Sequence, residues 1–342
     1  MSEPTPAQLL RRVVTGGMLD AGASARVFGA IMDGKVHESE LAAFLTAQAV
    51  RGPTVPEIVG AARAMRAAMT TLPAPPRAID LCGTGGDGKG TLNISTAVSL
   101  VAAACGVPVA KHGNRNMSSR TGAADVLEAL GVKIDVPPET ARACLEDAGV
   151  CFLFAQAYHP AMKHVAPVRR ALGIRTIFNL LGPLCNPAGV RRQLLGVYAK
   201  EWIVPLAEVL KALDSEKAWV VHGGDGLDEA TTTDVTHVAV LDGGRVSTRT
   251  ITPEDAGLER ATLEHLKGGA PAENAEAIRR LLYGEKSPYR DIVLFNTAAA
   301  LVVADKAGDL YEGANLAAAA IDSGAAKRVL ERLVAASHGA RP

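Results

Sequence analysis

Several features that would assign the chain to a particular class of protein are missing from its sequence. Charge of one sign is not in excess, because 36 Lys and Arg residues balance 36 Asp and Glu residues. Non-specific nucleic-acid binders usually carry a basic surplus, although a local basic patch remains compatible with this balance. Aromatic residues make up only 4% of the chain, against 48% hydrophobic residues in all. The composition therefore indicates a protein rich in Ala, Val and Leu that can bury a large core.

Cysteine pairs and membrane-spanning runs are absent as well. The five cysteines are scattered and form no C-x-x-C pair, which argues against a disulfide framework or a zinc knuckle and favours reduced thiols. The N-terminus, "MSEPTPAQLLRR", has no apolar signal core. The best apolar run, "AVSLVAAACGVPVA", is too short to span a bilayer and contains Gly106 and Pro108. We therefore expect a soluble, cytoplasmic protein with no membrane or nucleic-acid partner.

A change of pattern near residue 72 divides the chain into two parts. The 342 residues suit two domains, and the first 71 read as helices. There "TVPE" predicts a capping box, with Thr54 as N-cap and Glu57 three residues on. Apolar residues at helical spacing follow in "EIVGAARAMRAAM". The proline-rich "TLPAPPR" at 71–77 then interrupts the helical pattern and reads as a link.

Short apolar runs alternate with helix-like segments from residue 72 onward. The candidate strands are "AIDLC", "VPVAK", "VKIDV", "VCFLFA", "LLGVYA" and "AWVVHG", and such runs are typical of a parallel sheet covered by helices. We expect the helical segment 159–188, rich in Arg, Gly and Pro, to fold back onto the N-terminal helices and to shape a cleft. The expected fold class is α/β, with a small all-helical domain and a large α/β domain around a mostly parallel sheet.

A glycine-rich stretch, "CGTGGDGKGTLNIST" at 82–96, joins the first candidate strand to a helix. Glycines let backbone N–H groups turn toward one point, and the following helix offers further free N–H groups and its positive dipole end. These features favour a phosphate or pyrophosphate site over a plain turn in which Asn93 or Ser95 caps the helix. The stretch is not a P-loop, because no G-K-[ST] follows.

Basic and polar residues crowd into a second segment, "KHGNRNMSSRTGAADVLEALG", which follows the candidate strand "VPVA". Taken singly, Lys111 or Arg115 reads as a solvated loop charge and His112 as a structural histidine. However, open α/β sheets bind ligands at the carboxyl ends of their strands, and Lys and Arg there neutralise phosphate charge. Two such loops on neighbouring strands can face one ligand, which favours the binding-site interpretation.

Acidic residues and arginines mark two further clusters. The segment "HGGDGLDEATTTD" places Asp228 and Glu229 close to glycines, which suits Mg²⁺ bridging to substrate phosphates, although a solvated acidic loop looks the same. The segment "VRRALGIRT" contains Arg169, Arg170 and Arg175, spaced as a basic helix face, and an arginine that lines a cleft would clamp a carboxylate. The residues alone therefore predict an enzyme that binds a polyphosphorylated substrate with Mg²⁺.

Four motifs together give the chain a family resemblance. "GTGGDGKGTLNIST", "KHGNRNMSSRTGAADVLEALG", "HPAMKHVAPVRRALGIRTIFNLLGPLCNPA" and "GLDEAT" resemble those of the anthranilate phosphoribosyltransferases of tryptophan biosynthesis, and the similarity covers nearly the whole chain. The resemblance implies transfer of the 5-phosphoribosyl group from phosphoribosyl pyrophosphate to the amine of anthranilate. The products would be N-(5-phosphoribosyl)anthranilate and pyrophosphate, in the second step from chorismate. The resemblance further implies two Mg²⁺ ions per active site and a homodimer formed through the small domains.

The resemblance also implies domain boundaries and site residues. A small helical domain would comprise 1–71 with about 160–188, and a large α/β domain would comprise 72–159 with 189–342. The phosphoribosyl pyrophosphate site would contain Gly83, Gly86, Asp87, Thr91, Asn93, Ser95, Thr96, Lys111, His112, Gly113, Asn114, Arg115, Asn116, Met117, Ser118, Ser119 and Ala123. The anthranilate site would contain Gly83, Asn114, His159 and Arg169, and the metal site Ser95, Asp228 and Glu229.

The implied mechanism centres on the leaving group. Departure of pyrophosphate adds negative charge to that group, which Mg²⁺, Lys111 and fixed backbone N–H groups would stabilise. No covalent nucleophile is required, and His112 is a candidate proton acceptor. The alternatives are a pyrimidine nucleoside phosphorylase, whose fold is related, and a non-catalytic relative that binds nucleic acid. The "KHGNR" segment and the Asp228–Glu229 pair favour the transferase.

Overall fold

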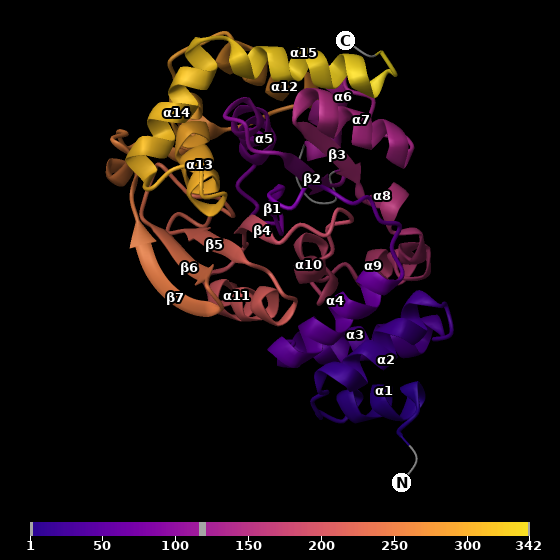
Figure 1. The fold of residues 1–342 in the computed structure, drawn as a ribbon. Coiled ribbons are helices and arrows are strands. Elements are labelled where there is room, and N and C mark those ends of the chain that lie inside the picture. Colours follow the sequence, from indigo (N-terminus) through magenta and orange to yellow (C-terminus); the bar gives the residue numbers. More distant parts are fainter. Residues whose placement is uncertain (1–2, 116–120, 341–342) are drawn as a thin grey trace.

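A twisted sheet with helices on both faces forms the larger part of the molecule, and a helical layer is attached at one end (Figure 1). The structure, a computed structural model, describes residues 3–115 and 121–340, and within these ranges the sheet has seven strands in the order β3-β2-β1-β4-β5-β6-β7. The strands are β1 (Ile79–Gly83), β2 (Val109–Gly113), β3 (Val150–Phe154), β4 (Arg192–Gly196), β5 (Lys217–Gly223), β6 (Thr236–Asp242) and β7 (Arg245–Ile251). Neighbours among β1–β5 are parallel, and β6 and β7 add an antiparallel edge. The expected α/β class with a mostly parallel sheet is confirmed.

Helices occupy most of the remaining described chain. The N-terminal group is α1 (Pro6–Val14), α2 (Ala21–Met32), α3 (Glu38–Arg51) and α4 (Val55–Ala67). Helices within the sheet region are α5 (Ile94–Ala104), α6 (Ala123–Ala129), α7 (Pro138–Ala148), α8 (Ala155–Tyr158), α9 (Ala166–Leu172), α10 (Phe178–Leu181) and α11 (Ile203–Ala212). The C-terminal group is α12 (Pro271–Leu282), α13 (Pro288–Val303), α14 (Leu310–Asp322) and α15 (Ala325–Ser337).

The predicted capping box at Thr54 is confirmed and is part of a buried polar cluster. The Thr54 side chain accepts from Glu57 N, and the Glu57 carboxylate accepts from Thr54 N at 2.8 Å. Glu57 is fully buried, and Arg51 Nη2 donates to its Oε1 at 2.6 Å. The same oxygen accepts from Leu19 N at 3.2 Å. Because its oxygens are paired in this way, the Glu57 carboxylate is retained inside the helical layer.

An aromatic cluster joins the segment 159–188 to the N-terminal helices. Phe28 of α2 packs edge-on against Phe44 of α3, with ring centroids 5.8 Å apart, and against Phe178 of α10, at 5.7 Å. Val168 of α9 is buried in the same apolar cluster. Such contacts are worth more than their buried area alone, so they fix α9 and α10 on the helical layer.

Side chains that alternate along the strands divide the core into two clusters. Leu194 and Val221 belong to the apolar cluster beneath α5, α13 and α15. Their strand neighbours Leu195 and Val220 point to the other face and join the cluster of α11 and the N-terminal helices. Figure 1 shows this division, with α12–α15 above the sheet and α11 and α4 below it.

One predicted strand is wrong and two strands were not predicted. "VKIDV" (132–136) is not a strand, because Val132 and Ile134 pack into the helical side of the core and Lys133 N donates to Ser337 Oγ at 3.0 Å. The hairpin of β6 and β7 was missed, although a Gly243–Gly244 turn joins its strands. The other five candidate strands coincide with β1–β5, with ends shifted by a few residues.

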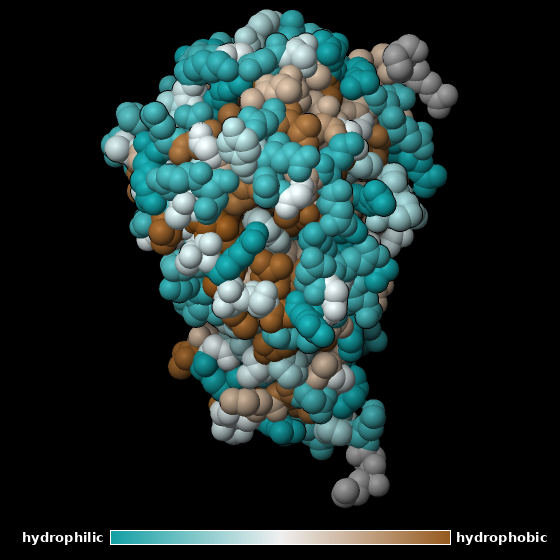
Figure 2. Space-filling model, turned by 60° about the vertical axis from the view of Figure 1, so that its left-hand side comes forward, coloured by the Kyte–Doolittle hydropathy of each residue, from teal (hydrophilic) through white to brown (hydrophobic). Residues whose placement is uncertain are grey.

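Hydrophilic residues cover most of the face shown in Figure 2, and hydrophobic residues are visible mainly in a band down its middle. Over the whole described surface, the exposed large hydrophobic residues are scattered, with Val50 and Tyr283 the most exposed. Single exposed apolar residues of this kind are ordinary on globular proteins. None of the helices in the described ranges combines the length and hydropathy that a membrane crossing requires.

Candidate active site

The candidate site lies where the strand order of the sheet reverses. From β1 the sheet continues through β2 and β3 on one side and through β4 and β5 on the other. The loops that follow β1 and β4 therefore diverge, and open α/β sheets bind ligands at such a point. Gly83 and Gly196 are paired at this edge, and loop 84–93 begins there.

The glycine loop presents unpaired backbone donors. Gly85, Gly86, Gly88 and Gly90 have φ between +64° and +79°, a region in which only glycine is unstrained. Within the described part of the chain, the N–H groups of Gly86, Asp87 and Gly88 have no acceptor. Consecutive free N–H groups on a tightly wound backbone are what an anion requires. The loop therefore has the donors expected of a phosphate site.

Two carboxylates reach this loop from the turn after β5. Asp228 Oδ2 accepts from Gly85 N at 2.8 Å, and the carboxyl group of Asp87 is close enough to raise the pKa of Asp228. Glu229 accepts from the hydroxyl of Ser95, in the first turn of α5, and the nearby Ser95 backbone N–H also lowers the pKa of Glu229. The carboxylates of Asp228 and Glu229 thus lie beside the glycine loop and the N-terminus of α5, and all three predicted metal ligands are close together.

Bare backbone makes room for Asp228. A Cβ atom on Gly83 would lie 2.4 Å from Asp228 Oδ2, and one on Gly196 would lie 1.6 Å from the Asp228 carbonyl oxygen. Both distances are far below van der Waals contact. Glycine at the ends of β1 and β4 is therefore required for Asp228 to reach the loop.

Burial and mutual repulsion favour the protonated forms of these acids. Burial first, then Asp87 and Glu229, raises the pKa of Asp228 well above its usual range. Burial also raises the pKa of Glu229 to about 7, against the opposing effects of Ser95 and Lys111. A cation bound here would remove this cost.

The donor set suits a hard cation that keeps other ligands. Among the residues that the structure describes, no three His, Cys, Asp or Glu side chains form a complete metal site. The oxygens of Ser95, Asp228 and Glu229 nevertheless match the preference of Mg²⁺, which usually binds one or two carboxylates and takes water and substrate phosphate oxygens as well.

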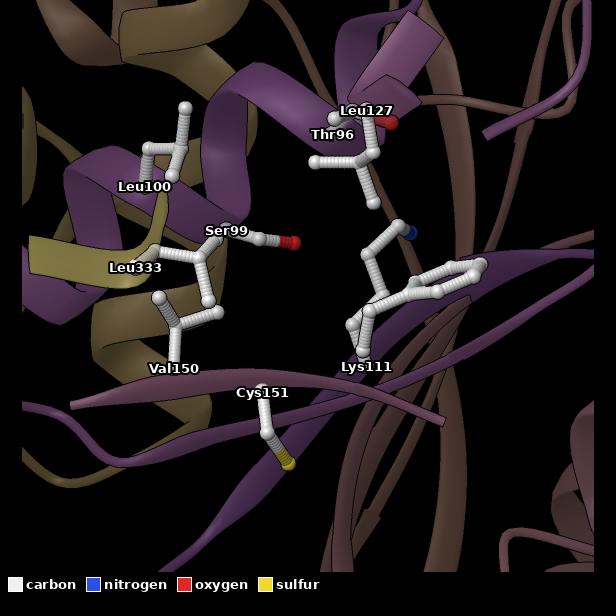
Figure 3. Close-up of a pocket in the computed structure, with 9 residues that line it drawn as sticks. Thr96, Ser99, Leu100, Lys111, Leu127, Val150, Cys151 and Leu333 are labelled. Atoms are coloured by element: carbon white, nitrogen blue, oxygen red, sulfur yellow. The ribbon is translucent and has the colours of Figure 1, made fainter. Parts of the chain in front are cut away.

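Lys111 and His112 lie inside β2 rather than in a loop after it, which corrects the placement expected from the sequence. Lys111 is 4% exposed, and its Nζ donates to Leu81 O at 2.5 Å. In Figure 3 its side chain runs along a cavity of about 10 Å³, opposite Ser99 and near Thr96 of α5. That volume holds at most one water molecule. Lys111 therefore influences the site through its charge, which lowers the pKa of Glu229.

The segment after β2 is only partly described. Gly113 ends β2, and Ala123 begins α6. Asn114 Oδ1 accepts from Arg115 N at 2.8 Å, and Arg115 Nη2 donates to Glu128 Oε1 at 2.8 Å. The Arg115 guanidinium is thus directed toward α6. Four predicted donor-site residues lie outside the described residues: Asn116, Met117, Ser118 and Ser119.

Distant residues that were not predicted anchor the end of the glycine loop. Thr91 forms an isolated bridge with Lys267. Asn93 Oδ1 accepts from Asn274 Nδ2 at 2.9 Å, and Tyr289 Oη donates to Asn93 O at 3.1 Å. No motif or spacing relates these residues to a loop so far away in the chain, so the sequence contained no signal for them.

Two histidines form a neutral pair beside this edge. His112 Nδ1 donates to Gly182 O at 3.1 Å, and His112 Nε2 lies 3.2 Å from His159 Nε2. Burial lowers the pKa of His112 to about 3 and that of His159 to about 4. Both ring nitrogens of His112 are therefore engaged in an uncharged pair, and His112 is a weak proton acceptor.

Arg169 is a half-buried cation without an anionic partner among the described residues. Its guanidinium lies over the Phe178 ring, 5.5 Å from the centroid. Burial alone lowers the pKa of Arg169, because no carboxylate offsets it. A cation placed in this way is suited to a ligand carboxylate, which would bind in a two-point fashion.

Comparisons with known proteins match the whole of this arrangement. The "Glycosyl transferase family, helical bundle domain" matches residues 7–69, and the "Glycosyl transferase family, a/b domain" matches residues 75–327. The anthranilate phosphoribosyltransferase of Methylocella silvestris is 58% identical over 332 residues, which are 97% of this chain and 95% of the relative.

Solved structures agree with the sequence relatives. The anthranilate phosphoribosyltransferase of Thermus thermophilus superposes with a TM-score of 0.91 at 47% identity, covering 96% of this chain and 99% of that one. The enzyme of Saccharomyces cerevisiae, in complex with PRPP and Mg, superposes with a TM-score of 0.90 at 29% identity, covering 99% of each chain. The chain therefore belongs to the anthranilate phosphoribosyltransferase family.

Proposed function

We propose that the protein transfers the 5-phosphoribosyl group of phosphoribosyl pyrophosphate to the amine of anthranilate in tryptophan biosynthesis. The observation that carries the proposal is the glycine loop, where the N–H groups of Gly86, Asp87 and Gly88 have no acceptor among the described residues and lie near the carboxylates of Asp228 and Glu229. A diphosphate with a bound cation is the ligand that complements this combination of donors and acids. Membership of the family gives the reaction.

The donor side comprises residues that the sequence predicted, with revised roles, together with Gly88, which was not predicted. Gly86, Asp87 and Gly88 supply N–H groups to the diphosphate. Ser95, Asp228 and Glu229 hold Mg²⁺, with two ions per site as part of the proposal. When bound, Mg²⁺ supplies positive charge that stabilises the departing diphosphate. Lys111 contributes charge from the interior, and its Nζ remains on Leu81 O.

The acceptor side is built from side chains. Arg169 binds the anthranilate carboxylate, since it is a half-buried cation with no anionic partner among the described residues. His112 and His159 form a neutral wall of the pocket, because both rings are buried and paired. Gly83 and Asn114 border the same pocket from the ends of β1 and β2.

The reaction is then a displacement in which no proton has to be transferred before the amine attacks. The amine nitrogen bonds to C1 of the ribose as the C1–oxygen bond to pyrophosphate breaks, and the nitrogen releases a proton afterwards. Fixed N–H groups stabilise the negative charge that develops on the leaving group. Arg169 and the donor loop hold the reacting atoms in line, and this positioning supplies much of the rate.

The domain division and assembly are part of the proposal. Residues 1–71 with about 160–188 form the small domain, and 72–159 with 189–342 form the large one. The shared aromatic cluster of Phe28, Phe44 and Phe178 supports this grouping. We assign a homodimer through the small domains and a cytoplasmic location on the same family basis.

Anthranilate fluorescence tests the proposal. The purified protein is mixed with anthranilate, phosphoribosyl pyrophosphate and Mg²⁺, with one control containing EDTA and one lacking the donor. The expected result is a loss of fluorescence that needs both donor and metal. Persistent fluorescence with folded protein, combined with phosphorolysis of thymidine or uridine, would replace the proposal with a nucleoside phosphorylase activity.

A further inference from the structure

Arg175 lies near the glycine loop but is not one of the residues of the proposed donor or acceptor site. It follows α9, and its guanidinium carbon lies over the Tyr198 ring, 4.3 Å from the centroid. Its Nη2 donates to Gly86 O in the glycine loop. No acidic residue pairs with Arg175 in the described part of the chain, where its one hydrogen bond is to this carbonyl.

Each end of the glycine loop is already attached elsewhere. Thr84 N donates to Gly196 O at 2.9 Å, and Gly85 N donates to Asp228 Oδ2. At the other end, Gly268 N donates to Gly90 O at 2.9 Å. Within the described residues, the bond from Arg175 is the only hydrogen bond from outside the loop to the backbone of 86–89.

Because the peptide group is planar, the hydrogen bond from Arg175 to Gly86 O also fixes the direction of the next N–H group. The carbonyl of Gly86 and the N–H of Asp87 belong to one trans peptide unit, in which they point in opposite directions. By binding the carbonyl, Arg175 holds the Asp87 N–H on the other side, and that N–H has no acceptor in the described chain. Glycine at 86, with φ +79°, otherwise leaves this peptide free to rotate.

The ring beneath Arg175 is itself fixed to the loop. Tyr198 N donates to Thr84 Oγ1 at 3.0 Å, so the residue that supports the guanidinium is tied to the start of the loop. A planar guanidinium stacked on an aromatic ring has fewer orientations available than a free lysine would have.

We infer that Arg175 is a positioning residue of the donor site, which holds the Gly86–Asp87 peptide so that its N–H faces the diphosphate. The inference rests on the proposed function, because it takes the diphosphate as the ligand of the loop. Arg175 acts through the backbone and not as a charge on the substrate.

Calorimetry with Mg²⁺ and inorganic pyrophosphate, without anthranilate, tests the inference together with steady-state kinetics. We expect Arg175→Ala to weaken pyrophosphate binding and to raise the donor KM by about tenfold, the lower end for a lost hydrogen bond from a charged group. The KM for anthranilate at saturating donor should stay within twofold of the unmodified protein's. Arg63→Ala is the matched control, since Arg63 also donates to a backbone carbonyl, that of Ala212 at 3.0 Å, at an exposed position outside the site.

Two further variants separate positioning from direct charge. Tyr198→Leu should show a smaller loss than Arg175→Ala, and the double variant should be no worse than Arg175→Ala alone, because Tyr198 acts through Arg175. Arg175→Lys keeps the charge and loses the stacked plane, so it should recover less than half of the lost binding free energy. Full recovery by Lys, or additive losses in the double variant, would overturn the inference.

Each of the remaining results of the calorimetry and kinetics would lead to a different conclusion. Unchanged pyrophosphate binding in Arg175→Ala would remove the role, and a rise in the anthranilate KM alone would move Arg175 to the acceptor side. If the unmodified protein binds Mg²⁺-pyrophosphate but transfers nothing to anthranilate, the proposed function fails while the inference about the loop stands. If the unmodified protein binds no pyrophosphate, both fail.

Discussion

The two sides of the proposed site would bind their ligands by different means. The donor side would use backbone N–H groups of a glycine loop and buried acids that contact that loop. The acceptor side would use side chains, namely Arg169, which has no anionic partner among the described residues, and the neutral His112–His159 pair. A backbone site recognises charge and tolerates few substitutions at glycine, whereas a side-chain site recognises shape and a single carboxylate. Changes on one side should therefore leave the affinity of the other side largely intact.

The largest effect is expected on the donor side. Asp228→Asn with Glu229→Gln should lower turnover by more than about a hundredfold and weaken the dependence on Mg²⁺, because the carboxylates that would hold the ion are removed. Turnover is measured over a range of Mg²⁺ concentrations. Asp225→Asn in the same turn is not a suitable control, because Asp225 accepts from Thr231 Oγ1. Asp242→Asn is preferred, because Asp242 lies at the exposed end of β6 and its ion pair with Lys217, at 3.5 Å, is outside the site. Full activity in the double variant would exclude these residues as metal ligands.

An effect almost as large is expected on the acceptor side. Arg169→Ala should raise the anthranilate KM by an amount equivalent to about 2–4 kcal/mol, since a half-buried contact to a carboxylate is lost. The donor KM should change little, because Arg169 does not contact the donor in the proposed site. Arg170→Ala serves as the comparison, because Arg170 is exposed and adjacent. An unchanged anthranilate KM would show that another residue binds the carboxylate.

The pH dependence of metal binding should be intermediate in size. The pKa of Glu229 is raised from 4.5 to about 7, so a proton competes with the cation below that pH. Stabilisation by Mg²⁺, measured as the shift in Tm, should therefore be larger at about pH 8 than at about pH 6. In the metal-free protein the pH dependence is opposite. Between pH 4.5 and about 7 the folded state keeps Glu229 protonated whereas the unfolded state does not, so the contribution of Glu229 to the free energy of unfolding falls as the pH rises through this range. A Mg²⁺-induced shift that does not vary between these pH values would contradict the assignment.

The smallest effect is expected at the histidine pair. His112→Gln should lower kcat by less than about tenfold, because an uncharged ring with both nitrogens engaged contributes packing and not proton transfer. With pKa values of about 3 and 4, the pair should also add no acid limb to the rate profile between about pH 5 and 8. A loss of several hundredfold, with a pH profile that shifts in the variant, would restore His112 as a proton acceptor.

Features that are local in the chain could be predicted from the sequence, whereas those that depend on packing could not. The glycine loop and the Asp228–Glu229 pair are local in the chain, so composition and spacing alone pointed to a phosphate and metal site. The parallel strands β1–β5 were visible as apolar runs. In contrast, "VKIDV" resembles a strand in its residues, and only its packing into the apolar core and the bond of Lys133 N to Ser337 in α15 show that it is not one.

The contacts between distant segments of the chain could not be predicted from the sequence. Asn274 and Tyr289 support Asn93, and Arg175 supports Gly86, through hydrogen bonds between segments that no local pattern relates. Lys111 looked like a loop residue that contacts phosphate, but the strand continues through it and its ammonium is bound to Leu81 O. Whether a charged side chain faces a ligand or the core depends on the strand register, which is fixed by the sheet as a whole.

Binding of Mg²⁺-pyrophosphate to three forms of the protein, measured by calorimetry without anthranilate, tests the division of the cleft most directly. We expect the unmodified protein and Arg169→Ala to bind it with the same affinity, within about twofold, and Asp228→Asn with Glu229→Gln to lose binding. Equal losses in Arg169→Ala and in the double variant would contradict a separate donor side, because the two groups of residues would then form one site.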